Sequence, residues 1–117
     1  MGIQYRKASI ILNNGEIIMK LNEGRIVYNE FDINFDEDFS NQENCLLEDL
    51  LQISYADGYL LDLGWYPEFD ANGNFKMQVI KDGNWDSPIY FRECREKNDL
   101  IQCISDADIF IQSLLKR

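Results

Sequence analysis

Residues 58–85 read GYLLDLGWYPEFDANGNFKMQVIKDGNW, and this stretch decides how the sequence divides into structural elements. Residues 59–69 and 74–81 are predicted to form two β-strands, because apolar and polar side chains alternate along the second run. The Asp-Ala-Asn-Gly sequence between them favours a tight turn, since Asn and Gly tolerate the positive φ of short hairpin loops. Leucines occur on both faces of the first run, with Asp62 as the polar exception, which indicates a central strand.

Three shorter strand patterns precede this hairpin. Residues 5–13, 16–22 and 25–35 alternate with a period of two, and Asn-Asn-Gly and Glu-Gly turns separate them. They predict a three-stranded antiparallel meander. The residues of the third run that are expected to face inward are Val27, Phe31, Ile33 and Phe35.

A helix is predicted over residues 40–55. Ser40 and Glu43 have the spacing of a capping box, in which each side chain accepts a hydrogen bond from the other residue's backbone N–H. Gly58 can adopt the left-handed conformation that ends a helix. The apolar positions with helical spacing are Leu46, Leu47, Leu50 and Leu51.

The C-terminal part predicts a strand over residues 88–95 and a final helix capped by Asn98 or Asp99. The apolar stripe of this helix comprises Leu100, Ile101, Ile104, Ala107, Ile111, Leu114 and Leu115. The order βββ-α-βββ-α predicts an α+β fold, namely a single antiparallel sheet of about six strands with two helices packed on one face. We expect one domain spanning residues 1–117.

Composition narrows the class of protein. The chain of 117 residues is 45% hydrophobic and 13% aromatic, which is typical of a folded globule. It has no apolar run of about 18 residues and no N-terminal secretory signal, so we expect a cytoplasmic protein. Cys45, Cys94 and Cys103 lack metal-ligand or disulfide spacing and are expected to be buried thiols.

The formal net charge of −10 is unevenly distributed. Residues 26–75 contain twelve acidic side chains and no Lys or Arg, whereas the remaining residues contain nine acids and eleven bases. We call residues 26–75 the acidic block. A field of one sign repels nucleic acid and anionic membranes and attracts basic surfaces, so the expected partner is a basic protein and neither nucleic acid nor membrane.

The sequence offers little support for catalysis. It has no histidine and neither the G-x-S-x-G nor the G-x-x-x-x-G-K-[ST] motif. We therefore expect no catalytic residues, no metal site and no cofactor. Two alternatives remain open: a small carboxylate-dependent metal-binding enzyme using Asp62 with Glu68 or Asp70, and an acidic adaptor domain whose charge serves only solubility.

The run LDLGWYPE at residues 61–68, followed by Asp70, Gly73, Phe75, Trp85 and Pro88, resembles the central signature of small bacterial immunity proteins. These proteins belong to contact-dependent growth inhibition (CDI) and related polymorphic toxin systems. The resemblance covers most of the second half of the chain. It implies a protein that is not an enzyme and that neutralises a toxin delivered into the cytoplasm, and many such toxins are nucleases with basic clefts.

The signature itself is expected to be structural, with Gly64 and Pro67 shaping the strand end and Trp65 packed inside. Tyr66 and Trp85 are expected at the surface, where such side chains often anchor interfaces. The predicted toxin-binding residues are therefore the acidic positions together with Tyr66: Glu30, Asp32, Asp36, Glu37, Asp38, Asp62, Tyr66, Glu68 and Asp70.

Overall fold

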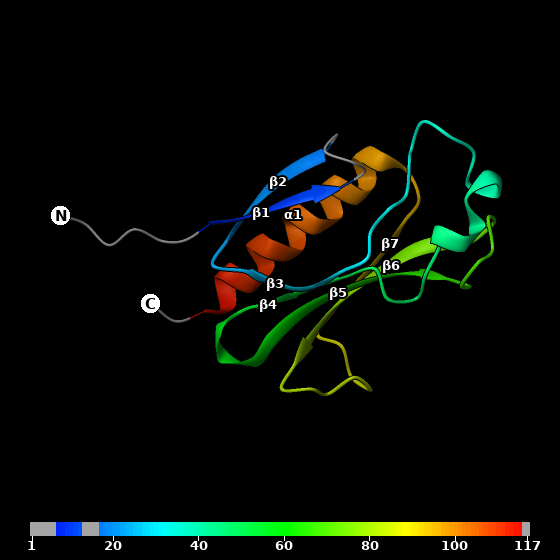
Figure 1. Ribbon diagram of the computed structural model, residues 1–117. Coiled ribbons are helices and arrows are strands. Elements are labelled where there is room, and N and C mark those ends of the chain that lie inside the picture. The colour runs from blue at the N-terminus through cyan, green and yellow to red at the C-terminus, as the bar shows by residue number, and fades with distance from the viewer. Residues whose placement is uncertain (1–6, 13–16, 116–117) are drawn as a thin grey trace.

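A computed structural model describes residues 7–12 and 17–115, with side chains from residue 23 onward. The described chain forms a hairpin, a five-stranded antiparallel sheet and one α-helix (Figure 1). The hairpin consists of β1 (Lys7–Leu12) and β2 (Ile17–Asn22). The sheet has the order β3-β4-β5-β6-β7, and α1 follows its last strand. These elements are β3 (Arg25–Asn29), β4 (Leu51–Ser54), β5 (Tyr59–Tyr66), β6 (Asn74–Lys81), β7 (Tyr90–Cys94) and α1 (Lys97–Leu114).

The strand pair predicted from residues 58–85 is confirmed as β5 and β6, and β5 is the central strand of the sheet. Its odd-numbered residues Leu61, Leu63 and Trp65 are fully buried in the core. The connection to β6 differs from the prediction. The strand ends at Tyr66 instead of continuing to residue 69, and residues 67–73 form a loop that begins with a cis peptide bond between Tyr66 and Pro67.

The helix predicted over residues 40–55 is wrong. Two short 3₁₀ turns, Phe39–Asn41 and Glu43–Cys45, are followed by an extended segment and β4. The capping box does not form. Instead the Gln42 side chain accepts a hydrogen bond from the Asn34 backbone N–H at 2.8 Å and donates one to the Asn34 carbonyl at 2.7 Å.

The leucine-rich run fits either period, and the neighbouring strand decides between them. β4 pairs antiparallel with β5, and every second side chain of an extended strand points to the same face. Leu51, Ile53 and Tyr55 are therefore buried in the core. Gly58, with φ +81°, lies in the turn between these strands and does not end a helix.

The predicted three-stranded meander is also wrong, since β3 pairs with β4 and not with β2. A register shift between Ile26 and Tyr28 breaks the alternation, and Val27 is 47% exposed instead of facing inward. An extra residue in one strand moves the following side chains to the opposite face. Parts of the predicted ranges, residues 5, 6, 13 and 16, lie outside the described chain. The other residues expected to face inward do so: Ile33 is buried, and Phe31 and Phe35 pack partly buried against the core.

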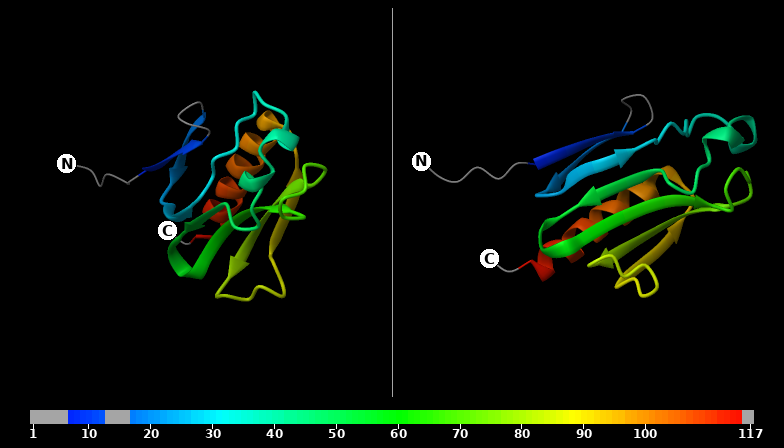
Figure 2. Two further views of the ribbon diagram at one scale, coloured as in Figure 1. Left: turned by 45° about the vertical axis from the view of Figure 1, so that its right-hand side comes forward. Right: turned by 60° about the horizontal axis from the view of Figure 1, so that its bottom comes forward.

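The final helix α1 packs on one face of the sheet against β6 and β7 and also contacts β2 (Figures 1 and 2). Its predicted apolar stripe is confirmed, because Leu100, Ile104, Ala107 and Ile111 are buried. The helix begins at Lys97, and Glu96 occupies the cap position that the sequence assigned to Asn98 or Asp99. The α+β class is thus confirmed, with five strands in the main sheet and a single helix in place of six strands and two helices.

Beyond the N-terminus of α1, residues 31–39 cover the same face of the sheet. Phe31 stacks on Phe75 with a centroid distance of 6.0 Å, and Phe39 meets Trp65 edge-on at 5.0 Å. Trp65 and Phe75 are themselves 4.9 Å apart and perpendicular. This aromatic cluster closes the end of the core that the helix does not reach.

One polar contact is buried in this core. The Tyr55 hydroxyl donates a hydrogen bond of 2.6 Å to Asp108 Oδ1, joining the end of β4 to α1. Asp108 is only 4% exposed. Burial and the Asp108 carboxylate raise the pKa of Tyr55 above its usual range.

Replacement of Tyr55 by phenylalanine is therefore expected to lower the free energy of unfolding by about 1–3 kcal/mol, because a buried carboxylate loses one of its donors. Urea denaturation followed by circular dichroism measures the change. Tyr28→Phe is the matched control, since Tyr28 is 39% exposed, and it should change stability by no more than about 0.5 kcal/mol. Equal losses in the two variants would contradict a stabilising role for the buried contact.

Candidate protein-binding surface

The face of the sheet opposite α1, which we call the outer face, carries the even-numbered residues of β5. Neither α1 nor the hairpin lies over it (Figure 2). The strand register places five side chains in one row across all five strands of this face. The row consists of Tyr28, Gln52, Asp62, Gln78 and Phe91.

Asp62 lies at the centre of the row and is held by its two neighbours. Gln52 Nε2 donates to Asp62 Oδ1 at 3.0 Å, and Gln78 Nε2 donates to Oδ2 at 3.2 Å. Both donors are neutral amides. Desolvation raises the pKa of the Asp62 carboxyl, and the two amide hydrogen bonds lower it but do not cancel that effect.

The prediction that Asp62 is one of the freely exposed acidic positions is wrong, because its exposed fraction is 4%. The strand alternation places Asp62 between Gln52 and Gln78, and these side chains cover the carboxylate from both sides. Its charge nevertheless belongs to the outer face.

Tyr66 lies on the same face, beside Gly64. A Cβ atom on Gly64 would lie 1.8 Å from the Glu48 carbonyl oxygen and 3.0 Å from the Tyr66 ring. The glycine therefore allows the chain around Glu48 and the tyrosine ring to come close to the strand. Glu48 N–H in turn donates to Glu68 Oε2 at 3.0 Å, which brings these two residues together.

We call Glu48, Asp49, Asp62, Glu68 and Tyr66 the outer acidic patch. Burial raises the pKa of the Tyr66 hydroxyl, and all four carboxylates raise it further. Glu48, Asp49 and Glu68 are exposed to solvent, whereas Tyr66 is half-buried. The patch thus combines an aromatic ring with several negative charges on one uncovered sheet face.

Glu48 and Asp49 were not among the predicted binding residues, because that stretch was expected to be helical. The backbone pairs with β5 on either side of them, through Leu50 N–H to Leu63 O at 3.0 Å and Trp65 N–H to Leu47 O at 2.8 Å. The pair of acids therefore bulges out of the ladder. The sequence signal for this bulge is the Glu-Asp pair, which interrupts a run of leucines.

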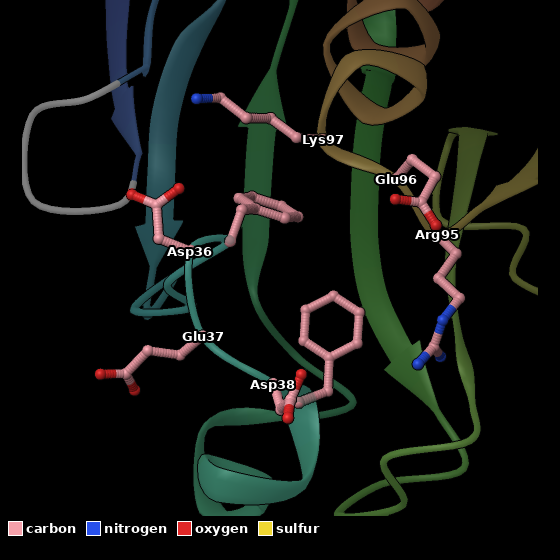
Figure 3. A pocket seen from close by; sticks show the side chains of 8 residues that line it. Asp36, Glu37, Asp38, Arg95, Glu96 and Lys97 are labelled. Carbon is pink, nitrogen blue, oxygen red and sulfur yellow. The ribbon is translucent and has the colours of Figure 1, made fainter.

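Three further predicted residues, Asp36, Glu37 and Asp38, lie elsewhere. They line an open cavity of about 310 Å³ between the 35–39 segment and the junction of β7 with α1, and we call it the rim cavity (Figure 3). The same cavity is lined by two phenylalanines, two cations and a glutamate: Phe35, Phe39, Arg95, Glu96 and Lys97. The rim cavity is therefore mixed in charge.

Arg95 is committed to the fold. Its guanidinium donates to the carbonyl oxygens of Gly73 at 2.5 Å and Ala71 at 2.8 Å, and it lies 4.7 Å from the Phe39 ring centroid. Figure 3 shows it directed toward the end of β5 and the loop that follows. It holds the 67–73 loop against the aromatic cluster.

The remaining predicted residues do not join either region. Glu30 and Asp32 are exposed in the segment after β3, and the Glu30 N–H donates to the Leu50 carbonyl at 2.8 Å. Asp70 is half-buried, and its carboxylate accepts a hydrogen bond from the Asn72 N–H at 2.9 Å. Trp85 is 48% exposed, as predicted.

The salt bridges of the described residues do not neutralise the acidic block. Among the described residues the salt bridges join Lys76 to Glu93 at 3.6 Å and Lys81 to Asp82 at 3.9 Å. All four of these side chains lie outside residues 26–75. No carboxylate of the block is therefore neutralised by a cation within the part of the chain that the structure describes.

The other reactive side chains give no clear site. Within residues 7–12 and 17–115 no three Cys, Asp or Glu side chains gather as metal ligands, and the rim cavity includes neither Asp62, Glu68 nor Asp70. The three cysteines are free and half-buried, where full burial was expected. Burial and the neighbouring Cys103 raise the pKa of the Cys94 thiol to about 12.

Comparisons with family models, curated proteins and solved structures found no match for this chain. None of the helices formed by the described residues is both long and apolar enough to cross a membrane.

The environment of Asp62 predicts a pH-dependent effect of the substitution Asp62→Asn. Because the folded state raises the pKa of this carboxyl, folding favours its protonated form, and ionisation costs stability as the pH rises through and above its ordinary value. The amide removes that cost. The stability of D62N relative to the wild type should therefore increase from pH 3.5 to pH 7, as measured by thermal unfolding.

The control for this experiment is Asp86→Asn, since Asp86 is fully exposed in the turn before β7. Its stability should follow that of the wild type at both pH values. A D62N variant that loses stability relative to the wild type as the pH rises would contradict the desolvation of Asp62.

Proposed function

We propose that this chain is a cytoplasmic immunity protein that binds a basic protein toxin, in particular a nuclease domain, and neutralises it by covering its active site. It acts by binding and has no catalytic role. One observation carries the proposal: the carboxylates of the acidic block have no cationic partner among the described residues, and most of them are exposed.

Electrostatics supplies the mechanism. A cleft that binds nucleic acid is lined by Lys and Arg, and a surface rich in carboxylates presents the charge that those residues bind. Complementary fields raise association rates by about 10- to 1000-fold over neutral surfaces. For an inhibitor of a toxin, fast capture has an evident use, because the toxin is harmful from the moment it enters.

The resemblance to CDI immunity proteins supports the same proposal from other residues. Among its signature residues, Gly64 allows the close approach of the Glu48 backbone, and Trp65 is buried in the core. Pro67 follows a cis peptide bond. These roles are structural, which leaves recognition to the surrounding acidic side chains.

A growth assay tests the proposal. The proposal expects a toxin domain in the adjacent upstream reading frame; this domain is induced in bacteria with and without this chain, and co-expression is expected to restore growth. Reversing the charge of several block residues should abolish protection, because the steering field is lost. The variant carries lysine at Asp32, Asp36, Glu48, Asp49 and Glu68, so that the outer acidic patch is reversed together with two other exposed acids of the block.

The matched control reverses an equal number of exposed acids outside the block and therefore changes the net charge equally. It carries lysine at Asp82, Asp86, Glu93, Asp99 and Asp106. This control should keep most of the protection. If both variants protected as well as the wild type, charge-based neutralisation by the block would be wrong.

A further inference from the structure

We propose that the outer face of the sheet, centred on Tyr66 and the exposed carboxylates of Glu48, Asp49 and Glu68, is the surface that receives a Lys- or Arg-rich segment of the partner. The inference rests on the proposed function in one respect, namely that the partner is a basic protein. It adds which face binds and which side chains make the contact.

The first argument is that this face is uncovered and partly apolar. The row across the sheet ends in Tyr28, which is 39% exposed, and Phe91, which is 47% exposed. Ile89, just before β7, is 42% exposed. Exposed aromatic rings around a polar centre are typical of protein interfaces.

The second argument is the charge around Tyr66. Glu48, Asp49 and Glu68 are exposed and form no salt bridge within the described part of the chain, and each of them contributes to the electrostatic environment of the tyrosine. The Glu48–Glu68 hydrogen bond holds two of these residues together at 3.0 Å. Tyr28 lies on the edge strand β3, and the negative charges of Glu30 and Asp49 likewise raise the pKa of its hydroxyl, after the larger effect of desolvation.

The third argument is the chemistry of Asp62. Its carboxylate accepts hydrogen bonds from two neutral amides and forms no salt bridge among the described residues. An arriving guanidinium could stack on the Tyr66 ring next to these carboxylates, an arrangement that combines cation–π attraction with ion pairing. Lys76 Nζ already lies over this ring, 5.4 Å from its centroid, and pairs with Glu93 at 3.6 Å.

Charge complementarity favours the outer face over the rim cavity. Asp36, Glu37 and Asp38 share that cavity with Arg95 and Lys97, whose positive charges oppose the entry of another cation. Beside the outer acidic patch, Lys76 lies 5.4 Å from the Tyr66 ring centroid and is already paired with Glu93.

Two matched triple variants test the inference. The outer variant is E48Q/D49N/E68Q, and the rim variant is D36N/E37Q/D38N. Each variant removes three negative charges and keeps side chains that can accept hydrogen bonds. Circular dichroism checks that both variants fold as the wild type does. Binding of a fluorescent oligo-arginine peptide to the full chain is measured by anisotropy at low salt.

We expect the outer variant to bind the peptide about tenfold more weakly than the wild type and the rim variant less than about threefold more weakly. An equal or larger loss in the rim variant would overturn the inference and leave the proposed function standing. Absence of peptide binding by the wild type would overturn both. If the outer variant instead turned a wild-type dimer into a monomer on gel filtration without weakening peptide binding, the face would be a self-association surface and the inference would fail.

Discussion

Replacement of Trp65 by alanine is expected to lower the free energy of unfolding by about 3–5 kcal/mol. The indole is fully buried and meets Phe39 and Phe75 edge-on, with centroids 5.0 Å and 4.9 Å away. Its Nε1 donates to the Asp70 carbonyl at 2.7 Å, which ties the 67–73 loop to the core. The substitution therefore creates a cavity and removes one of the two hydrogen bonds that the Asp70 carbonyl accepts, the other coming from the Gly73 N–H at 2.9 Å.

Chemical denaturation of the Trp65 variant measures this loss. Trp85→Ala is the matched control, because Trp85 is 48% exposed in the turn between β6 and β7 and should cost no more than about 1 kcal/mol. Since natural domains are stable by only about 5–15 kcal/mol, the Trp65 variant is expected to be largely unfolded at elevated temperature. Similar losses in the two tryptophan variants would contradict the placement of Trp65 in the core.

The substitution Gly64→Ala is expected to cost at least about 2 kcal/mol, although it adds a single methyl group. That methyl group would lie 1.8 Å from the Glu48 carbonyl oxygen, a backbone atom that cannot rotate away. Either the 46–50 segment separates from β5 or the strand shifts. The outer acidic patch should be disturbed too, because Glu48 and Tyr66 both pack against this glycine.

The substitution Gly83→Ala separates the effect of this steric clash from the effect of a positive φ, which is the second reason for a glycine in a fold. Gly83 has φ +71° but no atom within 4 Å of its missing Cβ, so alanine there suffers only backbone strain, worth about 1 kcal/mol. Thermal unfolding should rank the Gly64 variant well below the Gly83 variant. The reverse order would contradict the close approach of Glu48 to β5.

The features that the sequence predicted correctly are those with a strong local period. The β5–β6 pair and the stripe of α1 repeat every second and every third or fourth residue, and each packs against the core as expected. Residues 46–55 were misassigned because Leu46, Leu47, Leu50 and Leu51 satisfy a helical spacing as well as a strand. Pairing with β5, a contact with residues later in the chain, decides for the strand.

The sequence predicted the negative charge of the candidate site but not where its residues lie in the fold. The acidic block follows from counting charges along the chain. Its division into an outer acidic patch and a rim cavity depends on the bulge at Glu48 and Asp49 and on the path of residues 31–39 over the opposite face. Neither feature has a local sequence signal strong enough to place it in space.

The most direct test of the proposed function is the salt dependence of association between this chain and the toxin domain that the proposal expects as its partner, measured by stopped-flow fluorescence. We predict fast association at low salt, with a rate constant that falls steeply as salt is added and a dissociation rate that changes little. No association at low salt, or an association rate independent of salt, would contradict the account.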